Sequence, residues 1–300
     1  MIVPPPVVPG ATVGVVAPGG AVNPDALARG VAALEAMGYH VRLATHVLER
    51  RRYLAGPSEV RLADLVAMLR DPEIGAVFCA RGGSGTSQVL PHLDPALVAA
   101  HPKLVVGYSD VSPLLGWVVE RCGVVALHGP MVATDLAKGL TDRAAARLGA
   151  LLAAPGAGWR EPITDVLAAG AATGRLVGGC LSSLVALLGT PYAIETDGAV
   201  LFLEDVGEPL YRLDRLLTQL ALSSRLTRVH GIVAGQLSRC GRGETDWRER
   251  FRQLLAAVAP PSAVVLEGLP FGHGAVNTPI PLGVEVEVDT VRGDVAWGGA

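Results

Sequence analysis

In the first half of the chain, short apolar runs alternate with segments whose apolar residues recur at helical spacing. The runs have the length and β-branched content of buried strands, and they lie at residues 11–17, 40–46, 74–80, 103–109 and 123–129. Helical spacing is found at 23–39, at 58–73 and directly after residue 110. Strands and helices that alternate in this way predict a doubly wound, mostly parallel sheet of the Rossmann-like kind.

Beyond about residue 150 the pattern changes. The stretch 151–174 is rich in Ala, Gly and Pro and is typical of a connection. It is followed by apolar strand patterns within 198–208, 229–237, 262–272 and 281–289, and by helical patterns at 211–222 and 245–258. We therefore expect an N-terminal α/β domain at 1–155, a linker at 156–172, and a smaller mixed α/β domain at 173–300.

Composition narrows the class of protein. Half of the 300 residues are hydrophobic, which is enough for a sizeable core, and the 37 glycines and 22 prolines indicate many turns. The formal net charge of −3 gives no electrostatic reason to expect a nucleic acid or an acidic membrane as a partner. The four cysteines lack metal-type spacing, so we expect reduced, buried thiols. We also expect no metal and no cofactor.

Two uncharged stretches have the composition of a signal peptide or of a membrane-spanning segment. The first 24 residues carry no charge, but no Lys or Arg precedes Arg29 and prolines interrupt the run, so we do not expect a signal peptide. The uncharged run at 176–194 has about the length of a membrane span, yet its glycines, serines and proline favour a buried loop and helix. We expect a cytoplasmic protein with no membrane partner.

The sequence "GYSD" at 107–110 places a hydroxyl where a buried strand turns into an apolar helix. This context is the one that raises a serine nucleophile above the sheet in hydrolases, and the backbone N–H of Asp110 then stands at the helix start, where an oxyanion is stabilised. The G-x-S-x-G pattern is incomplete, because Val111 replaces the second glycine. Ser109 is therefore either a nucleophile or an ordinary turn or capping serine.

The loop "ARGGSG" at 80–85 also follows a strand. It lacks the lysine of a phosphate-binding loop, and its glycines do not match a dinucleotide fingerprint. A tight turn explains the glycines. They also let backbone N–H groups approach a ligand closely, and next to Ser109 they form a candidate half of an oxyanion hole.

A serine nucleophile needs a base and an acid that orients the base. His128, at a strand end, and His273, between two glycines in a loop, are equally good candidates for the base. The other five histidines lie at element edges or before an apolar strand. The acid is expected among Glu204, Asp205 and Glu208, which follow a strong apolar run.

A set of longer motifs resembles the LD-carboxypeptidases, a serine peptidase family that includes muramoyltetrapeptide carboxypeptidase and the microcin C self-immunity peptidase. The motifs are "ARGGSG", "GYSD", "HGPM", "GGCLSSLVALLGTPY", "LFLEDVGEPLYRLDRLLTQL" and "GLPFGHG". The resemblance runs from about residue 10 to 290 with matching order and spacing.

The resemblance implies roles for particular residues. It implies a catalytic triad of Ser109 as nucleophile, Glu204 as acid and His273 as base, and His128 then becomes a pocket-lining residue. The implied oxyanion donors are the backbone N–H groups of Gly83 and Asp110. Expected substrate contacts are Arg81, Ser84 and His128. Many family members carry an aromatic residue where this chain has Ser84.

The family implies a function as well. We expect a metal-free serine carboxypeptidase that releases the terminal D-Ala across the L,D-peptide bond of muramoyl tetrapeptides in murein recycling, and that forms a homodimer. The nucleophile is expected in the first domain, and the acid and base in the second. Two alternatives stay open: a hydrolase of peptidyl or aminoacyl sulfamoyl-adenylates, and a non-catalytic small-ligand binding protein. The sequence does not choose between diaminopimelate and lysine at the third peptide position.

Overall fold

The chain forms two sheets, and each sheet belongs to its own unit. The computed structural model describes residues 1–298. The first unit comprises residues 1–156 and 276–283, and the second comprises residues 157–275 together with those from 284 onwards.

The first unit contains a six-stranded sheet in the order β12-β5-β4-β3-β1-β2. Strands β1 to β5 run parallel, and β12 pairs antiparallel with β5 at the edge. The strands are β1 (Thr12–Val16), β2 (His40–Leu43), β3 (Ile74–Cys79), β4 (Leu104–Gly107), β5 (Ala126–His128) and β12 (Ile280–Leu282). The predicted doubly wound, mostly parallel sheet is thereby confirmed, with the strand order 2-1-3-4-5 of flavodoxin-like sheets.

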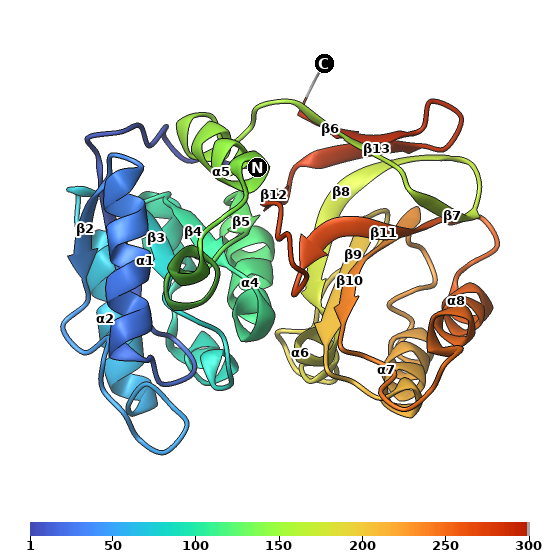
Figure 1. The fold of residues 1–300 in the computed structure, drawn as a ribbon, viewed down its shortest axis with the longest axis horizontal. Helices are drawn as coiled ribbons and strands as arrows, with labels where there is room; N and C mark the ends of the chain where they lie inside the picture. The colour runs from blue at the N-terminus through green and yellow to red at the C-terminus, as the bar shows by residue number, and fades with distance from the viewer. Residues whose placement is uncertain (299–300) are drawn as a thin grey trace. The chain divides into compact units, whose positions relative to one another are not determined.

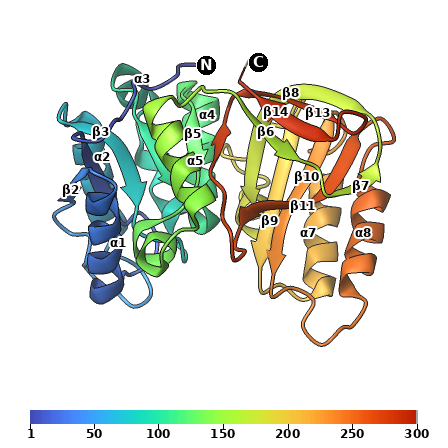
Figure 2. The same cartoon turned by 45° about the horizontal axis from the view of Figure 1, so that its top comes forward.

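Helices connect these strands, and α1 and α5 lie in front of the sheet in Figure 2. The helices are α1 (Pro24–Ala36), α2 (Ser58–Arg70), α3 (Pro95–Ala100), α4 (Ser112–Cys122) and α5 (Asp142–Ala153), with short turns η1 (Thr86–Gln88), η2 (Leu90–His92), η3 (Ser109–Val111) and the π-helical η4 (Val132–Leu136). The Asn23 side chain accepts a hydrogen bond from the Ala26 N–H and caps α1. Gly123 ends α4 in the left-handed conformation, at a φ of 66°.

The strand order fixes where a ligand can approach the first sheet. The order reverses between β1 and β3, and in open α/β sheets the ligand crevice lies at the carboxyl ends of strands at such a point. The loops at 17–20, after β1, and at 80–85, after β3, lie at this switch point. Ser109 follows β4, the next strand in the sheet.

The second unit contains an eight-stranded sheet in the order β6-β14-β13-β8-β9-β10-β11-β7. Strands β8 to β11 run parallel, and the others pair antiparallel. The strands are β6 (Trp159–Pro162), β7 (Asp165–Ala168), β8 (Ala171–Cys180), β9 (Val200–Val206), β10 (Gly231–Ser238), β11 (Val264–Gly272), β13 (Glu285–Asp289) and β14 (Asp294–Trp297). The second unit is therefore mixed α/β, as predicted.

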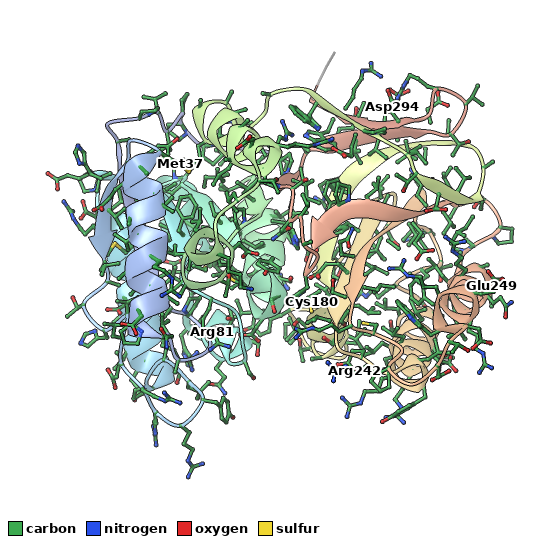
Figure 3. All side chains as sticks on the ribbon, viewed as in Figure 1. Met37, Arg81, Cys180, Arg242, Glu249 and Asp294 are labelled. Atoms are coloured by element: carbon green, nitrogen blue, oxygen red, sulfur yellow. The ribbon has the colours of Figure 1, made fainter. Side chains whose placement is uncertain are left out.

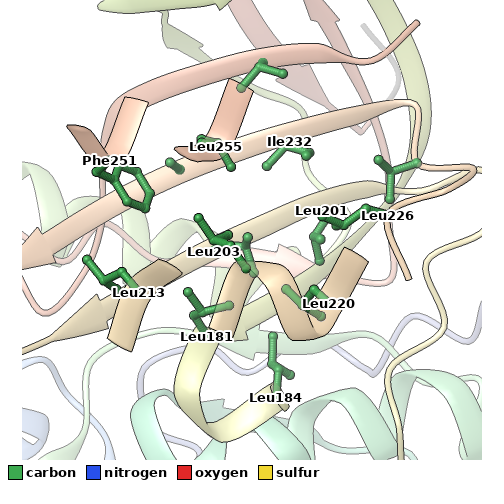
Figure 4. Packing of buried hydrophobic residues seen from close by; sticks show 14 of the residues in the cluster. Leu181, Leu184, Leu201, Leu203, Leu213, Leu220, Leu226, Ile232, Phe251 and Leu255 are labelled. Carbon is green, nitrogen blue, oxygen red and sulfur yellow. The ribbon is translucent and has the colours of Figure 1, made fainter. Parts of the chain in front are cut away.

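Three helices cover part of this sheet, as Figure 1 shows. They are α6 (Leu181–Val185), α7 (Leu210–Leu222) and α8 (Trp247–Val258). Leucines at three- and four-residue spacing on α7 face the strands and are almost fully buried. Figure 4 shows two of these side chains, Leu213 and Leu220, among leucines of α6 and β9. This apolar layer holds the carboxyl end of β9, where the acidic cluster begins.

The structure groups two segments differently from the expected domain boundaries. Residues 156–172, expected to be a linker, contain β6 and β7, which pair at opposite edges of the second sheet. Residues 276–283 belong to the first unit, because β12 pairs with β5. These edge strands are three or four residues long, and two of them contain proline, so they give no strand periodicity. Among the described residues, no helix is both long and apolar enough to span a membrane.

Candidate active site

Ser109 lies at a strained corner. Strand β4 ends at Gly107, and after Tyr108 the backbone of Ser109 has a φ of +62°, before η3 leads directly into α4. A residue with a side chain rarely adopts this left-handed conformation, which costs about 1–3 kcal/mol and persists where the surrounding structure enforces it, often at functional sites. Ser224, in the turn after the helix at 210–222, has the same conformation at a φ of +63°. What distinguishes Ser109 is its position at a strand-to-helix corner, the turn that presents a nucleophile in hydrolases.

The glycine turn after β3 lies against Ser109. A Cβ atom at Gly82 would lie 3.0 Å from the Ser109 Oγ and 3.1 Å from the Asp110 nitrogen, so the absence of a side chain leaves this space open. The Gly82 carbonyl accepts a hydrogen bond from the Gly20 N–H at 2.8 Å. Because the C=O and N–H of a trans peptide point in opposite directions, the Gly83 N–H points away from Gly20.

The carboxylate of Asp110 faces the glycine turn and does not accept a hydrogen bond from the Asp110 backbone N–H. Its Oδ2 accepts hydrogen bonds from the Thr86 N–H at 2.9 Å and from the Thr86 hydroxyl at 2.8 Å. Burial raises the pKa of Asp110, and the hydrogen bonds from Thr86 oppose that rise. Within residues 1–298, neither the Asp110 N–H nor the Gly83 N–H donates a hydrogen bond. Two such donors are what an oxyanion hole requires.

The three expected substrate contacts also lie in the first unit. Arg81, labelled in Figure 3, is partly buried and donates from Nη1 to the Ala21 carbonyl at 2.9 Å. Ser84 is exposed. His128 is fully buried at the end of β5, with its ring centroid 5.6 Å from that of Tyr108. Contact between these residues and a substrate stays a prediction.

Glu204 and His273 form a hydrogen-bonded pair in the second unit. Glu204 lies near the end of β9 and its side chain is fully buried, while the side chain of His273 is 15% exposed. The Glu204 Oε2 lies 2.6 Å from His273 Nδ1 and also accepts the His273 backbone N–H at 3.2 Å. A carboxylate accepts here, so Nδ1 carries the proton and Nε2 is the basic nitrogen of the neutral ring.

The loop that carries His273 depends on the glycine before it. Gly272 has a φ of +98°, and a Cβ atom at this position would lie 2.5 Å from the Glu204 Oε2. No other residue type fits without displacing the carboxylate. The glycine before His273 is therefore a requirement of the acid–imidazole contact.

The structure separates the three acids that the sequence left open. Asp205 turns toward α6, where its carboxylate accepts the Ser182 N–H at 2.8 Å and the Ser182 hydroxyl at 3.2 Å. The Glu208 Oε2 lies 3.4 Å from the Arg212 Nη1. Glu204 alone of the three contacts His273. Burial raises the pKa of Glu204, and the hydrogen bonds and charge of His273 oppose that rise.

Both units match models of known protein domains. The family model for the LD-carboxypeptidase N-terminal domain matches residues 13–129, and the model for the LD-carboxypeptidase C-terminal domain matches residues 173–288. The chain belongs to the LD-carboxypeptidase family. It is accordingly a peptidase of the carboxypeptidase kind, and the predicted family is confirmed.

Two curated relatives are similar along most of the LD-carboxypeptidase chain. A probable murein peptide carboxypeptidase of Bacillus subtilis is 36% identical over 290 residues, which cover 94% of this chain and 90% of that protein. The murein tetrapeptide carboxypeptidase of Pseudomonas aeruginosa is 38% identical over 287 residues, which cover 90% of this chain and 91% of that protein.

Solved structures show the same LD-carboxypeptidase fold. The muramoyltetrapeptide carboxypeptidase of Oxalobacter formigenes has a TM-score of 0.84 at 28% identity and covers 96% of this chain and 98% of its own. The microcin self-immunity protein MccF, in complex with glutamyl sulfamoyl guanosine, has a TM-score of 0.89 at 20% identity and covers 99% and 98%. The second likeness concerns the fold alone.

The structure therefore brings the predicted residues together in two groups. Ser109, Asp110 and Gly83 are gathered in the first unit, and Glu204 and His273 in the second. A contact between the base and Ser109 stays a prediction.

Two residues that adjoin the first group, Arg61 and Thr86, were not predicted from the sequence. The one available signal was that Arg61 lies four and eight positions before Leu65 and Leu69, on the buried face of α2.

Proposed function

We propose that this protein is a serine LD-carboxypeptidase that releases the terminal D-Ala from muramoyl tetrapeptides in murein recycling, with Ser109, His273 and Glu204 as its triad. The observation that carries the proposal is the left-handed backbone of Ser109 beside a glycine turn, where the N–H groups of Asp110 and Gly83 are the two backbone donors. The buried Glu204–His273 hydrogen bond supplies the matching base. The names of the Bacillus and Pseudomonas relatives support a murein peptide as the substrate.

The proposed reaction begins with attack by the Ser109 Oγ on the carbonyl carbon of the third peptide residue. His273 Nε2 accepts the hydroxyl proton as the bond forms. Glu204 holds Nδ1–H in place and stabilises the positive charge on the ring. The N–H groups of Gly83 and Asp110 stabilise the negative carbonyl oxygen, and each such donor contributes about 10²–10³ in rate.

The tetrahedral intermediate then breaks at the bond to D-Ala. The imidazolium of His273 donates its proton to the departing amine, which leaves an ester between Ser109 and the tripeptide. A water molecule gives a proton to His273 and attacks the ester carbonyl, and the returning proton restores the Ser109 hydroxyl as the tripeptide leaves. No atom changes its oxidation state in these steps, so they need no redox cofactor.

Arg81 is proposed to bind the carboxylate of the terminal D-Ala. A carboxypeptidase has to recognise a free carboxylate next to the scissile bond, and a guanidinium can bind both of its oxygens. The Arg81 Nη1 is held by the Ala21 carbonyl, and a Cβ atom at Gly83 would lie 3.4 Å from its Nη2, so the guanidinium lies beside the proposed oxyanion donor.

A panel of three defined substrates tests the proposal by mass spectrometry of the products. The first is the tetrapeptide L-Ala-γ-D-Glu-meso-diaminopimelate-D-Ala, the second has L-Ala at its terminus, and the third is a glutamyl sulfamoyl adenylate. The expected result is release of D-Ala from the first substrate alone. Hydrolysis of the third in preference to the first would assign the protein to the sulfamoyl-adenylate hydrolases instead. Binding of the first without turnover would favour a binding protein.

The proposal extends to assembly and location. A homodimer is expected from the family, and light scattering after size-exclusion chromatography tests it, with a mass near 62 kDa expected for two chains of 30.9 kDa. A cytoplasmic location follows from the proposed recycling of murein fragments. Detection of the protein in the extracellular fraction of its native host would contradict it.

A further inference from the structure

A deeply buried cation of the first unit lies next to the proposed oxyanion hole. Arg61, on α2, is only 2% exposed. Its guanidinium donates to the carbonyls of Pro18, Gly56 and Gly85 and to the Gln88 side chain, the last two at 2.8 and 2.6 Å. All four acceptors are uncharged oxygens, and the three carbonyls belong to three different loops.

Burial of a guanidinium against uncharged oxygens is costly, and burial lowers the pKa of Arg61 while the charge of Asp110 opposes this. The hydrogen bonds of the guanidinium offset part of this cost, and they fix the positions of the groups that accept them. Here they join the loop after β1, the loop before α2 and the loop after β3, two of which form the switch point of the sheet.

One peptide group connects Arg61 with the Ser109 turn. The Gly85 carbonyl accepts from Arg61 Nη1 at 2.8 Å, and the N–H of the same peptide, on Thr86, donates to the Asp110 carboxylate at 2.9 Å. A cation and an anion thus hold the opposite ends of one peptide dipole. Asp110 directly follows Ser109 in sequence, and the clamped peptide directly follows the glycine turn at 82–84.

We propose that Arg61 is a positioning residue for the oxyanion hole, which fixes the glycine turn against Ser109 through the Gly85–Thr86 peptide and the Asp110 carboxylate. This inference rests on the proposed function, because it assumes that the Asp110 and Gly83 N–H groups receive the oxyanion. Arg61 itself touches neither Ser109 nor any reacting atom. It acts on the distance between the two donors.

Arginine is specifically suited to this position. Its planar fork offers five donors and here contacts four acceptors in different directions, whereas lysine offers a single charged nitrogen with three donors. Arg61→Lys therefore keeps the charge and loses the geometry. Because a displacement of about 1 Å lowers catalysis by about 10²-fold, we expect kcat to fall by about 10- to 100-fold. KM should change less than about threefold, since the ground-state contacts remain.

The test combines substrate kinetics with a fluorophosphonate, which forms a covalent adduct at an activated serine. The matched control is Arg42→Lys, on β2, where Arg42 forms ion pairs with Asp71 and Glu73 at a partly exposed site. Wild type and Arg42→Lys should label Ser109 at the same rate, and Arg61→Lys about 10- to 100-fold more slowly. The ³¹P resonance of the adduct should move in Arg61→Lys and stay in place in Arg42→Lys, because it reports hydrogen bonds to the phosphonyl oxygen.

A second variant keeps the test valid if Arg61→Lys does not fold. Thr86→Val preserves the shape and the backbone N–H of this buried residue but removes its hydroxyl bond to Asp110. It should lower kcat with little change in KM, by a smaller factor.

The outcomes separate the two claims. A folded Arg61→Lys that labels Ser109 at the wild-type rate, or that raises KM and leaves kcat unchanged, would overturn the positioning role and leave the proposed function intact. Failure of the wild-type protein to label at Ser109 would overturn the proposed function, and the positioning role with it.

Discussion

The open space in front of Ser109 can be filled by one methyl group. Gly82 is not among the residues with positive φ, so its backbone accepts alanine. The added Cβ would lie 2.8 Å from the Ser109 Cβ, 3.0 Å from its Oγ and 3.1 Å from the Asp110 nitrogen. An oxyanion must lie about 2.7–3.1 Å from its donors, so the methyl group occupies the same space.

Gly82→Ala should therefore disable the Asp110 donor without unfolding the protein. Loss of one such donor lowers kcat by about 10²–10³, equivalent to about 2.7–4 kcal/mol of transition-state stabilisation. The assay is D-Ala release from the tetrapeptide, with the melting temperature measured in parallel. Because the closest contact, at 2.8 Å, is with the Ser109 Cβ and not with the end of a flexible side chain, a loss of stability of about 1–3 kcal/mol is also expected.

Gly116→Ala is the matched control, because Gly116 lies in α4 and a Cβ there meets nothing within 4 Å. It should keep full activity and stabilise the helix by about 0.5–1 kcal/mol. The reasoning about the oxyanion space would be refuted if folded Gly82→Ala kept kcat/KM within threefold of the wild-type value.

Three further predictions follow from contacts elsewhere. The raised pKa of Glu204 contributes stability that is complete below the ordinary glutamate pKa of about 4.3 and is lost as the pH rises through the raised value. At pH 7 Glu204→Gln should therefore lower kcat by about 10⁴-fold without lowering the melting temperature. A clear drop in melting temperature would contradict this. Gly30→Ala places a Cβ 1.8 Å from the Val132 carbonyl oxygen and should destabilise the protein by about 1–3 kcal/mol or more in urea unfolding; unchanged stability would show that α1 is not held against η4. Burial raises the pKa of Cys122 to about 12 and that of Cys240 to about 11, so iodoacetamide should leave native activity intact and alkylate these thiols only after unfolding.

The sequence predicted the parts of the fold that depend on apolar periodicity. β1, β3 and β4 are short β-branched runs buried on both faces, and α1 lies within the predicted helical stretch at 23–39. The edge strands β6, β7 and β12 could not be predicted in this way. They are stabilised by pairing with strands distant in the sequence, and their own three or four residues carry no repeat.

The candidate site also has parts that the sequence could predict and parts that it could not. The strand-to-helix turn at Ser109 could be recognised from local sequence, although the residues alone left the serine open as a nucleophile or as a turn or capping residue. The choice of Glu204 over Asp205 could not, since the two side chains alternate along β9 and only the paired strands decide which one meets the His273 loop. The family resemblance indicated Glu204, and the geometry gives the physical reason.

Arg61 marks the limit of reasoning from sequence. An arginine in an amphipathic helix normally extends to solvent. Two of the carbonyls that hold this one, those of Pro18 and Gly85, lie 43 residues before it and 24 residues after it in the sequence. Its role depends on the tertiary structure, which places those loops together at the sheet's switch point.

The most direct test of the central claim is the rate of D-Ala release from the L,D-tetrapeptide by Ser109→Ala. The serine is proposed to form the covalent intermediate, so its removal should lower the rate by about 10⁴-fold or more while the fold is preserved. A folded Ser109→Ala that retains activity within tenfold of the wild-type protein would contradict the claim that Ser109 is the nucleophile.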